Sequence, residues 1–322
     1  MKLCRSKAVA SVNPCKVLFI TGDFSKYVQR SFHHFSMALS ELVNLSLWHK
    51  SGHIRDILKQ LPERPDFILL NDIRERHCPR IEGLADLEIP IGVIVHDTHF
   101  NIEERKAFLT KNNIKHIFSI YRDPFLKLFP EFAHQMHWFP HFVDTKIFRD
   151  YELRRDIDYL LLGCTAASVY PLRKVMLDRM KSRKGFYHEE HPGYRDMTVE
   201  EEKKVLVNRN YAKAINRAKI FLSCDSTYHY PLRKYYEVLA CRTLLLSSVS
   251  KELLDLGFIP GVHFVEVTED NFEWKADYYL KNSAERNRIA EAGYEFIRKH
   301  HTVKHRARKF VEMVQEILKN QG

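Results

Sequence analysis

Residues 223–247 contain the side chains whose types and spacing best suit the binding of an anion. The segment predicts a strand, a polar loop, a helix and a second strand in succession. A helix start beside a polar loop offers unpaired N–H groups and the positive end of the helix dipole, both of which attract phosphate. Arg233 and Lys234 add positive charge in the first turn, where a cation is unfavourable unless an anion lies nearby. The segment therefore predicts a phosphate-binding site.

Glu237 lies four residues after Arg233 and therefore on the same face of that helix. Side chains at this spacing can form a salt bridge, which is one interpretation of the pair. The other interpretation is that one or both of them contact a ligand. Helix geometry alone does not choose between the two.

A second polar group follows an apolar run of β-branched residues at 91–95. His96, Asp97 and His99 would then lie at the carboxyl edge of a buried strand. Ligands of open α/β sheets bind at this edge, so we expect these residues to be functional. A histidine that only packs in the core is the alternative.

The histidine and cysteine patterns predict neither a metal site nor disulfides. His134, His137 and His141 lie close in sequence, but Pro140 breaks any helix that would align them. The six cysteines are scattered, with no Cys-x-x-Cys pair. We therefore expect free thiols and no bound metal.

The apolar runs that must position these residues alternate with helical stretches, which predicts an α/β fold with parallel sheets. Continuous apolar strands suit sheets that are covered on both faces. In the first half the predicted strands are 16–20, 44–48, 66–71, 91–95, 116–120 and 135–139, with a helix at 27–42. In the second half the predicted strands are 157–162, 219–224, 243–247 and 263–267, and the predicted helices are 171–182, 200–217 and 231–241.

A chain of 322 residues suits two domains of roughly 150 residues each. We expect Rossmann-like domains at 1–150 and 151–300, joined by the charged linker 149–156. If they face each other, the carboxyl ends of both sheets surround one cleft. Residues 301–322 predict an amphipathic C-terminal helix that packs on a domain, with the N-terminal domain as the candidate.

The net charge of +10 and the pI near 9.2 favour a polyanionic partner. Nucleotide phosphates, an anionic membrane surface and nucleic acid all fit, and charge alone does not choose among them. The basic run 298–309 predicts a solvated helix face, with peripheral contact to an anionic surface as the alternative. No apolar run approaches the roughly 20 residues that span a bilayer, and residues 1–14 lack the apolar core of a secretion signal. We therefore expect a cytoplasmic chain without a transmembrane segment.

The anion-binding segment resembles the nucleotide-sugar motif of retaining group-1 glycosyltransferases of the GT-B fold, especially their CgeB-like (spore-maturation protein) branch. Arg233, the pair Tyr236-Glu237 and the run 240–242 carry the resemblance. It implies that Glu237 hydrogen-bonds the ribose hydroxyls and that Arg233, with Lys234, neutralises the diphosphate. The sequence departs from the pattern at three positions, with His229 in place of a frequent Glu and Arg242 and Phe142 in place of Gly.

Further stretches match the same family in the same order along the chain. Residues 137–148 resemble the end of the family's first domain, and residues 285–306 its closing helices. His96 and Asp97 resemble a His-Asp pair that faces the donor sugar. In the family, the loop after the strand that Gly163 ends lies over the diphosphate. This adds Tyr170 and Arg173 as donor-binding candidates, although an ordinary surface arginine is the alternative for Arg173.

The resemblance implies a hexosyltransferase-like enzyme that transfers a sugar from a nucleotide-diphosphate donor, such as a UDP-sugar. The acceptor could be a glycan, a protein, a small molecule or a nucleic acid. No metal or other cofactor is implied. A glycosyltransferase acting on DNA bases and an inactive GT-B binding or coat protein are the alternatives. The expected catalytic residues are His96, Asp97 and Arg233, and the expected donor-binding residues are Gly163, Tyr170, Arg173, His229, Arg233, Lys234, Tyr236 and Glu237.

Overall fold

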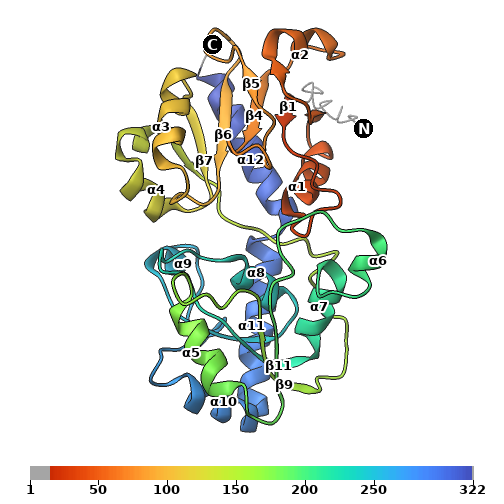
Figure 1. Ribbon diagram of the computed structural model, residues 1–322, viewed down its shortest axis with the longest axis vertical. Coiled ribbons are helices and arrows are strands. Elements are labelled where there is room, and N and C mark those ends of the chain that lie inside the picture. Colours follow the sequence, from red (N-terminus) through yellow and green to blue (C-terminus); the bar gives the residue numbers. More distant parts are fainter. Residues whose placement is uncertain (1–14, 321–322) are drawn as a thin grey trace, which may run out of the picture.

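Two parallel β-sheets form the framework of this computed structural model, which describes residues 15–320 (Figure 1). The first sheet has six strands in the order β2-β1-β4-β6-β7-β8, and the second has five in the order β10-β9-β11-β12-β13. Strands β3 and β5 form a separate pair. The α/β fold with two parallel sheets, predicted from the sequence, is confirmed.

Each sheet and its helices form one domain, and the last helix, α12 (Val303–Lys319), returns to the first domain. The first domain comprises β1 (Lys16–Ile20), α1 (Ser31–Ser40), β2 (Asn44–Trp48), β3 (Gly52–His53), α2 (Ile54–Gln60), β4 (Phe67–Asn71), β5 (Ile81–Glu82), β6 (Ile91–Val95), α3 (Ile102–Lys111), β7 (His116–Ser119), α4 (Arg122–Leu128), the 3₁₀ helix η1 (Pro130–Gln135) and β8 (Met136–Trp138). The second comprises β9 (Ile157–Leu162), α5 (Pro171–Met180), β10 (Phe186–Glu189), α6 (Val199–Glu202), α7 (Asn208–Arg217), β11 (Ala218–Leu222), α8 (Arg233–Ala240), β12 (Leu244–Ser247), α9 (Lys251–Asp255), β13 (Val265–Glu266), α10 (Phe272–Lys281) and α11 (Ser283–His300).

The central strands of the first sheet are almost entirely apolar because helices cover both of its faces. Every residue of β4 and β6 is buried, and the alternating side chains of β1 and β4 enter separate apolar clusters. Gly92 in β6 leaves room for an aromatic ring, since a Cβ there would lie 2.6 Å from the ring of Phe118. The sheet is thus packed tightly enough to hold the loops at its carboxyl edge in place.

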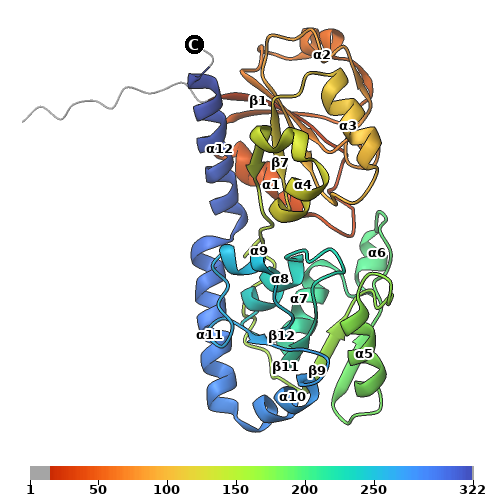
Figure 2. The ribbon, with the colours of Figure 1, turned by 90° about the vertical axis from the view of Figure 1, so that its left-hand side faces the viewer.

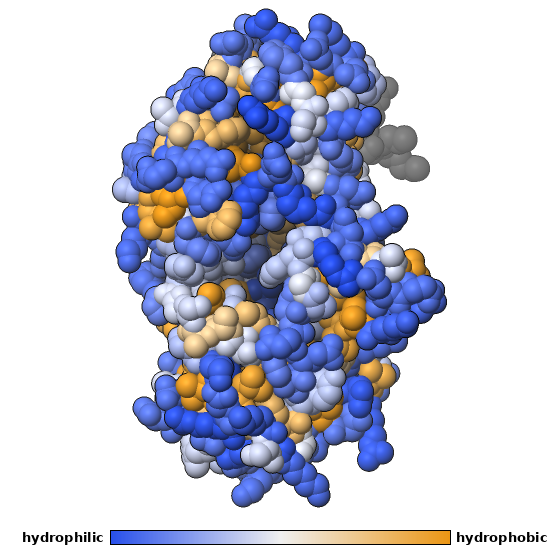
Figure 3. Space-filling model, viewed as in Figure 1, coloured by the Kyte–Doolittle hydropathy of each residue, from blue (hydrophilic) through white to orange (hydrophobic). Residues whose placement is uncertain are grey.

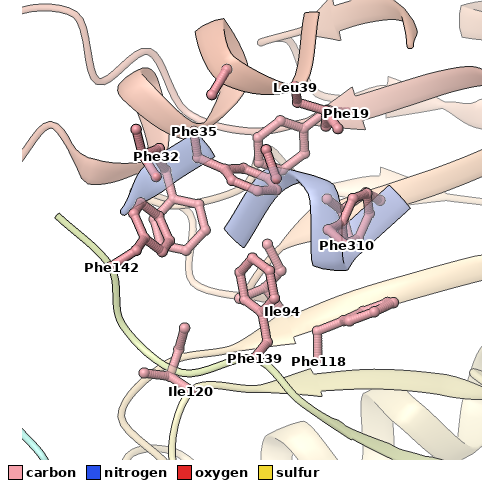
Figure 4. Packing of buried hydrophobic residues seen from close by; sticks show 14 of the residues in the cluster. Phe19, Phe32, Phe35, Leu39, Ile94, Phe118, Ile120, Phe139, Phe142 and Phe310 are labelled. Atoms are coloured by element: carbon pink, nitrogen blue, oxygen red, sulfur yellow. The ribbon is translucent and has the colours of Figure 1, made fainter. Parts of the chain in front are cut away.

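The C-terminal helices α11 and α12 run along one side of both domains (Figure 2). Helix α11 packs on the second domain, and α12 packs on α1 of the first. Figure 4 shows Phe310 of α12 among the aromatic rings of the first core. Its ring centroid lies 5.6 Å from that of Phe35 and 5.1 Å from that of Phe118. The last segment of the chain therefore completes the core of the first domain.

Arg242 occupies the position that glycine has in the resembling family, directly after the end of α8. Its φ of 55° is the left-handed conformation that favours glycine at a helix end. The guanidinium pairs with Asp150, at 3.2 Å, and with Glu291 of α11. Arg242 therefore ties the interdomain linker to α11, and it belongs neither to a phosphate site nor to a free solvated surface.

Most predicted strands are confirmed, and those at residues 16–20 and 157–162 have the predicted bounds. Two predicted helices are wrong at their starts, and a third is divided in two. The helix at 27–42 begins only at Ser31, and that at 231–241 begins at Arg233, after Pro231. The helix at 200–217 is two helices, α6 and α7, because the chain turns between them and Asn208 has a φ of 52°.

No helix within residues 15–320 is both long and apolar enough to cross a membrane. The segment 1–14, where we predicted the absence of a secretion signal, lies outside the described residues. The five described cysteines are free, as expected from their spacing.

The packing of α12 predicts a large effect of Phe310→Ala on stability. Truncation of a fully buried phenylalanine typically lowers the free energy of unfolding by about 3–5 kcal/mol. We expect a loss in this range, measured by urea unfolding. Arg308→Ala is the control, because Arg308 is exposed on the same helix, and its effect should stay within about 0.5 kcal/mol. Equal effects of the two substitutions would contradict the packing of α12 into the first core.

Candidate functional site

A cavity of about 500 Å³ lies between the two domains. Figure 3 shows the molecular surface hollowed at mid-height, where the domains meet. The loops that follow β6 in the first domain and β9 in the second line the cavity. The carboxyl edges of two parallel sheets thus meet at one site, as open α/β folds require for ligand binding.

Arg173 of α5 is buried beneath this cavity, with 2% of its surface exposed. Its guanidinium donates to the carbonyl oxygens of Cys164, at 2.8 Å, and Cys224, at 3.2 Å. No carboxylate among the described residues lies within salt-bridge distance of it. Two carbonyl dipoles compensate a full charge only in part, so the site favours an anion. The interpretation of Arg173 as an ordinary surface arginine is wrong.

Lys234, in the first turn of α8, also lines the cavity. Burial and the nearby charge of Arg173 lower the pKa of its ammonium to about 7. Within residues 15–320 its Nζ has neither a hydrogen-bond acceptor nor a carboxylate partner. Gly163, with a φ of 99°, makes room for it, because a Cβ at this position would lie 2.9 Å from Nζ. The strand end and the helix start therefore form a cationic pocket together.

Arg233 and Glu237 form a salt bridge of 2.5 Å, and both line the cavity. Only 4% of the surface of Glu237 is exposed. The two sequence interpretations, a salt bridge and contact with a ligand, are therefore compatible. The two side chains form an ion pair, and both also face the cavity. The salt bridge is therefore not an exposed pair on the helix surface, because the carboxylate is buried.

His96 and Asp97 line the cavity from the first domain. Nε2 of His96 lies 2.7 Å from Oδ1 of Asn71, and burial, with the nearby His77 and Arg74, holds the pKa of His96 well below its usual value. The imidazole is therefore neutral at neutral pH. Asp97 lies 3.2 Å from Arg74 and remains about half exposed. His96 can exchange hydrogen bonds with an uncharged ligand group, and Asp97 supplies a carboxylate at the cavity wall.

Tyr236 does not line the cavity, although it stands beside Glu237 in the sequence. It points into the core of the second domain, where its ring lies 5.2 Å from that of Phe258 and 5.4 Å from that of His301. Residues 233, 234 and 237 turn toward the cavity, whereas Tyr235 and Tyr236 belong to the opposite face of α8. The structure thus places Tyr236 outside the cavity where the sequence analysis expected it.

His229 is also absent from the cavity, and 77% of its side chain is exposed. Its neighbours explain this orientation. Tyr228 stacks on His99 at 3.9 Å, and the hydroxyl of Tyr230 lies 2.9 Å from Oγ1 of Thr98, so both face the first domain. His229, with a φ of 56°, turns outward and bonds Asp225 at 2.9 Å. His229 therefore also lies outside the cavity where the sequence analysis expected it.

Tyr170 and Gly163 lie at the cavity, as expected. The guanidinium of Arg173 lies 4.1 Å from the ring centre of Tyr170, and burial raises the pKa of the Tyr170 hydroxyl to about 12. Tyr170 thus covers one side of the cationic pocket.

Several cavity residues were not predicted. The segment 27–30 was assigned to a helix, yet it is a loop, and this part of the chain pairs with residues 195–197 of the second domain. The lining segment 189–194 follows β10, a strand of four residues that has no clear apolar pattern. The motif His191-Pro-Gly-Tyr194 was the available signal, since Pro-Gly marks a turn. Other unpredicted lining residues are His34, Asp144, Asn208 and Tyr211.

The three histidines considered as metal ligands do not converge on one point. His141 lies 2.9 Å from the hydroxyl of Tyr121, and His137 lies 3.3 Å from His116. In the described part of the chain, no group of three or more His, Cys, Asp or Glu is arranged to hold a metal ion.

Comparisons with known proteins indicate glycosyltransferases as similar proteins. Residues 173–312 match a protein family described as glycosyl transferase-like. Among solved structures, sucrose-phosphate synthase from Thermosynechococcus elongatus has a TM-score of 0.66 at 13% identity, covering 96% of this chain and 100% of its own. The fold is GT-B. HepE from Anabaena, in complex with UDP-glucose, has a TM-score of 0.62 at 8% identity, covering 94% of this chain and 99% of its own. No curated protein matches the sequence.

A third GT-B neighbour, a glycosyltransferase from Rickettsia africae, has a TM-score of 0.59 at 10% identity and covers 96% of this chain and 100% of its own. These structures confirm the predicted GT-B fold, and the family match over residues 173–312 agrees with the predicted glycosyltransferase class. The CgeB-like branch and the retaining type stay predictions.

The environment of Lys234 predicts an unusual titration. Its ammonium should lose its proton near pH 7 in the free protein, because burial and Arg173 disfavour the charged form. NMR of the lysine ¹³Cε signals against pH should show one signal with this midpoint, and Lys234→Met should remove it. A spectrum in which every lysine signal stays unchanged up to pH 9 would contradict the arrangement.

Proposed function

We propose that this chain is a glycosyltransferase whose cationic pocket binds the diphosphate of a nucleotide-sugar donor. The single observation that carries the proposal is the pair of cations, the buried Arg173 and the half-buried Lys234, which face a cavity without a carboxylate partner among the described residues. A diphosphate supplies the missing negative charge. The N-terminus of α8 points into the same cavity and adds its dipole.

The proposed reaction needs no protein-bound metal. An acceptor hydroxyl forms a bond to the anomeric carbon, the bond from that carbon to the diphosphate oxygen breaks, and the nucleoside diphosphate leaves with the electron pair. Arg173, Lys234 and Arg233 stabilise the negative charge that develops on the leaving group, which is commonly the largest contribution to such catalysis. His96 and Asp97 contact the sugar from the opposite wall.

The retaining outcome rests on the resemblance to group-1 enzymes. In that reaction the leaving phosphate itself takes the proton of the acceptor hydroxyl, on the face from which it departs. The anomeric configuration of the product, observed by NMR, decides between retention and inversion.

The first experiment is a thermal-shift and calorimetric screen of UDP, ADP and GDP and of their sugars. Binding of a nucleoside diphosphate, with loss of affinity in Arg173→Gln, supports the donor site. Lys174→Gln is the matched control, because Lys174 follows in the same helix and is exposed. Hydrolysis of the bound donor separates an enzyme from an inactive binding protein. The absence of binding by every nucleotide would overturn the proposal.

Donor affinity should depend on pH through Lys234. Its pKa is about 7 in the free protein, and a bound diphosphate raises it, so binding above pH 7 takes up a proton. Affinity for UDP should therefore be nearly constant below pH 7 and fall by up to about tenfold per pH unit above it. Isothermal titration between pH 6 and 9 measures this slope. Lys234→Met should bind weakly with no slope, and an unchanged slope in the variant would assign the titration to another group.

Glu237→Gln tests whether the buried carboxylate binds the ribose. A charge-assisted hydrogen bond contributes about 1.5–3 kcal/mol, so we expect UDP affinity to fall about tenfold or more. The affinity of 2′,3′-dideoxy-UDP should not change. Stability should fall by about 1–3 kcal/mol, because Arg233 loses its buried partner. Equal losses for both nucleotides would mean that Glu237 acts only through Arg233. Glu291→Gln is the control, since it alters the exposed pair with Arg242.

A further inference from the structure

A chain of hydrogen bonds crosses the carboxyl ends of three adjacent strands, β1, β4 and β6. Thr21 follows β1, Asn71 ends β4 and His96 follows β6. Nδ2 of Asn71 donates to Oγ1 of Thr21 at 2.9 Å, and Oδ1 of Asn71 lies 2.7 Å from Nε2 of His96. Asn71 is completely buried, so water cannot replace either bond.

The hydrogen bonds in the structure define one set of proton positions along this series of side chains. The hydroxyl of Thr21 donates to the carbonyl oxygen of Gly22 at 3.1 Å, so its oxygen accepts from Asn71. This orients the amide, and its carbonyl oxygen must face His96. A carbonyl oxygen can only accept, so Nε2 of His96 carries the proton. In the neutral ring, Nδ1 is then an acceptor.

The acceptor nitrogen is open to the cavity. His96 lines the cavity, and within residues 15–320 its Nδ1 has no protein partner. Nδ1 of His96 is not among the solvent-inaccessible atoms that lack a hydrogen-bond partner, whereas Nδ1 of the neighbouring His77 is. The rings of Phe32 and His77, each 4.7 Å away between centroids, hold the imidazole from its sides. The lone pair therefore points into a fixed part of the cavity.

We propose that Asn71 is a positioning residue that holds His96 as the Nε2–H tautomer, so that Nδ1 accepts a hydrogen bond from a hydroxyl of the donor sugar. The assignment of the sugar rests on the proposed function, whereas the tautomer does not. A hydroxyl is the matching group, because it can donate to Nδ1. A phosphate oxygen would face a lone pair and be repelled. His96 thus recognises the sugar and leaves the diphosphate to the cations of the second domain.

The tautomer is tested directly by ¹⁵N NMR of the full chain labelled at histidine, with His96→Asn used only to assign the signals. We expect the shifts of a neutral ring that is protonated at Nε2. Thr21→Val keeps Asn71 but removes the oxygen that orients its amide, so the signals should change to those of a mixture of tautomers. Thr21→Ser should restore the single tautomer. An imidazolium, or a ring protonated at Nδ1, in the wild type would overturn the inference.

The role in sugar binding is tested with Asn71→Asp, using UDP-glucose and UDP as probes. The carboxylate favours the imidazolium form of His96, in which Nδ1 donates a proton and can no longer accept one. Relative to the wild type at the same pH, the ratio of UDP-glucose affinity to UDP affinity should fall at least tenfold at pH 6 and recover at pH 9. The comparison with the wild type at the same pH cancels both the titration of Lys234 and that of the terminal phosphate, which UDP carries and UDP-glucose lacks.

Three outcomes of this experiment are distinct. A ratio that is unchanged in Asn71→Asp overturns the role in sugar binding. A loss of UDP binding by the wild type overturns the proposed function, and the NMR result still decides the tautomer. If Asn71→Asp does not fold, the same ratio is measured in Thr21→Val, where a fall of severalfold is expected and no change overturns the inference.

Discussion

The positive charge that Arg173 and Lys234 place beneath the cavity is the constraint on which the rest of the site depends. A buried cation without a counter-ion is costly, because the protein interior solvates it poorly. Carbonyl dipoles compensate the charge of Arg173 in part. Lys234 loses its proton near neutral pH, which removes the cost of its charge. The second domain therefore keeps a site that is stable when empty and still attracts an anion. Gly163 is part of the same arrangement, since any side chain there would meet Lys234.

The two domains are joined by contacts that also shape the cavity. Glu252, at the start of α9, accepts hydrogen bonds from the backbone N–H groups of Arg122 and Asp123, the first residues of α4. Burial raises the pKa of this carboxyl group, yet its position at the positive end of a helix favours the charge. On the opposite side, Asp196 pairs with Arg76 at 2.5 Å. Helix α12 also packs on the first domain, so several contacts join the two domains without a ligand.

The sequence predicts those parts of the fold that depend on local pattern. Strands such as β6 are continuous apolar runs, and their burial follows from the sheet alone. The start of α1 could not be predicted, because the preceding residues pair with residues 195–197, which are distant in sequence. The burial of Arg173 could not be predicted either, since its helix carries several charged residues and the sequence does not show which of them is enclosed. Local pattern located the cationic segment, but tertiary packing decided which of its side chains reach the cavity.

The outward turn of His229 has a consequence for how a sugar could be held. In the resembling family, a glutamate often stands at this position in the second domain. In this chain, Tyr228 and Tyr230, on either side of His229, contact the first domain and hold the loop against it. The second domain therefore offers no side chain at this point, and we infer that recognition of the sugar falls to the first domain. His96 and Asp97 are the groups available there. The neutral ring of His96, which Asn71 fixes, and the carboxylate of Asp97 can both form hydrogen bonds with hydroxyl groups. The cations of the second domain can bind the diphosphate. The proposed sugar contacts thus lie on the wall of the first domain and the proposed diphosphate contacts on the wall of the second, so the relative position of the domains fixes the distance between them.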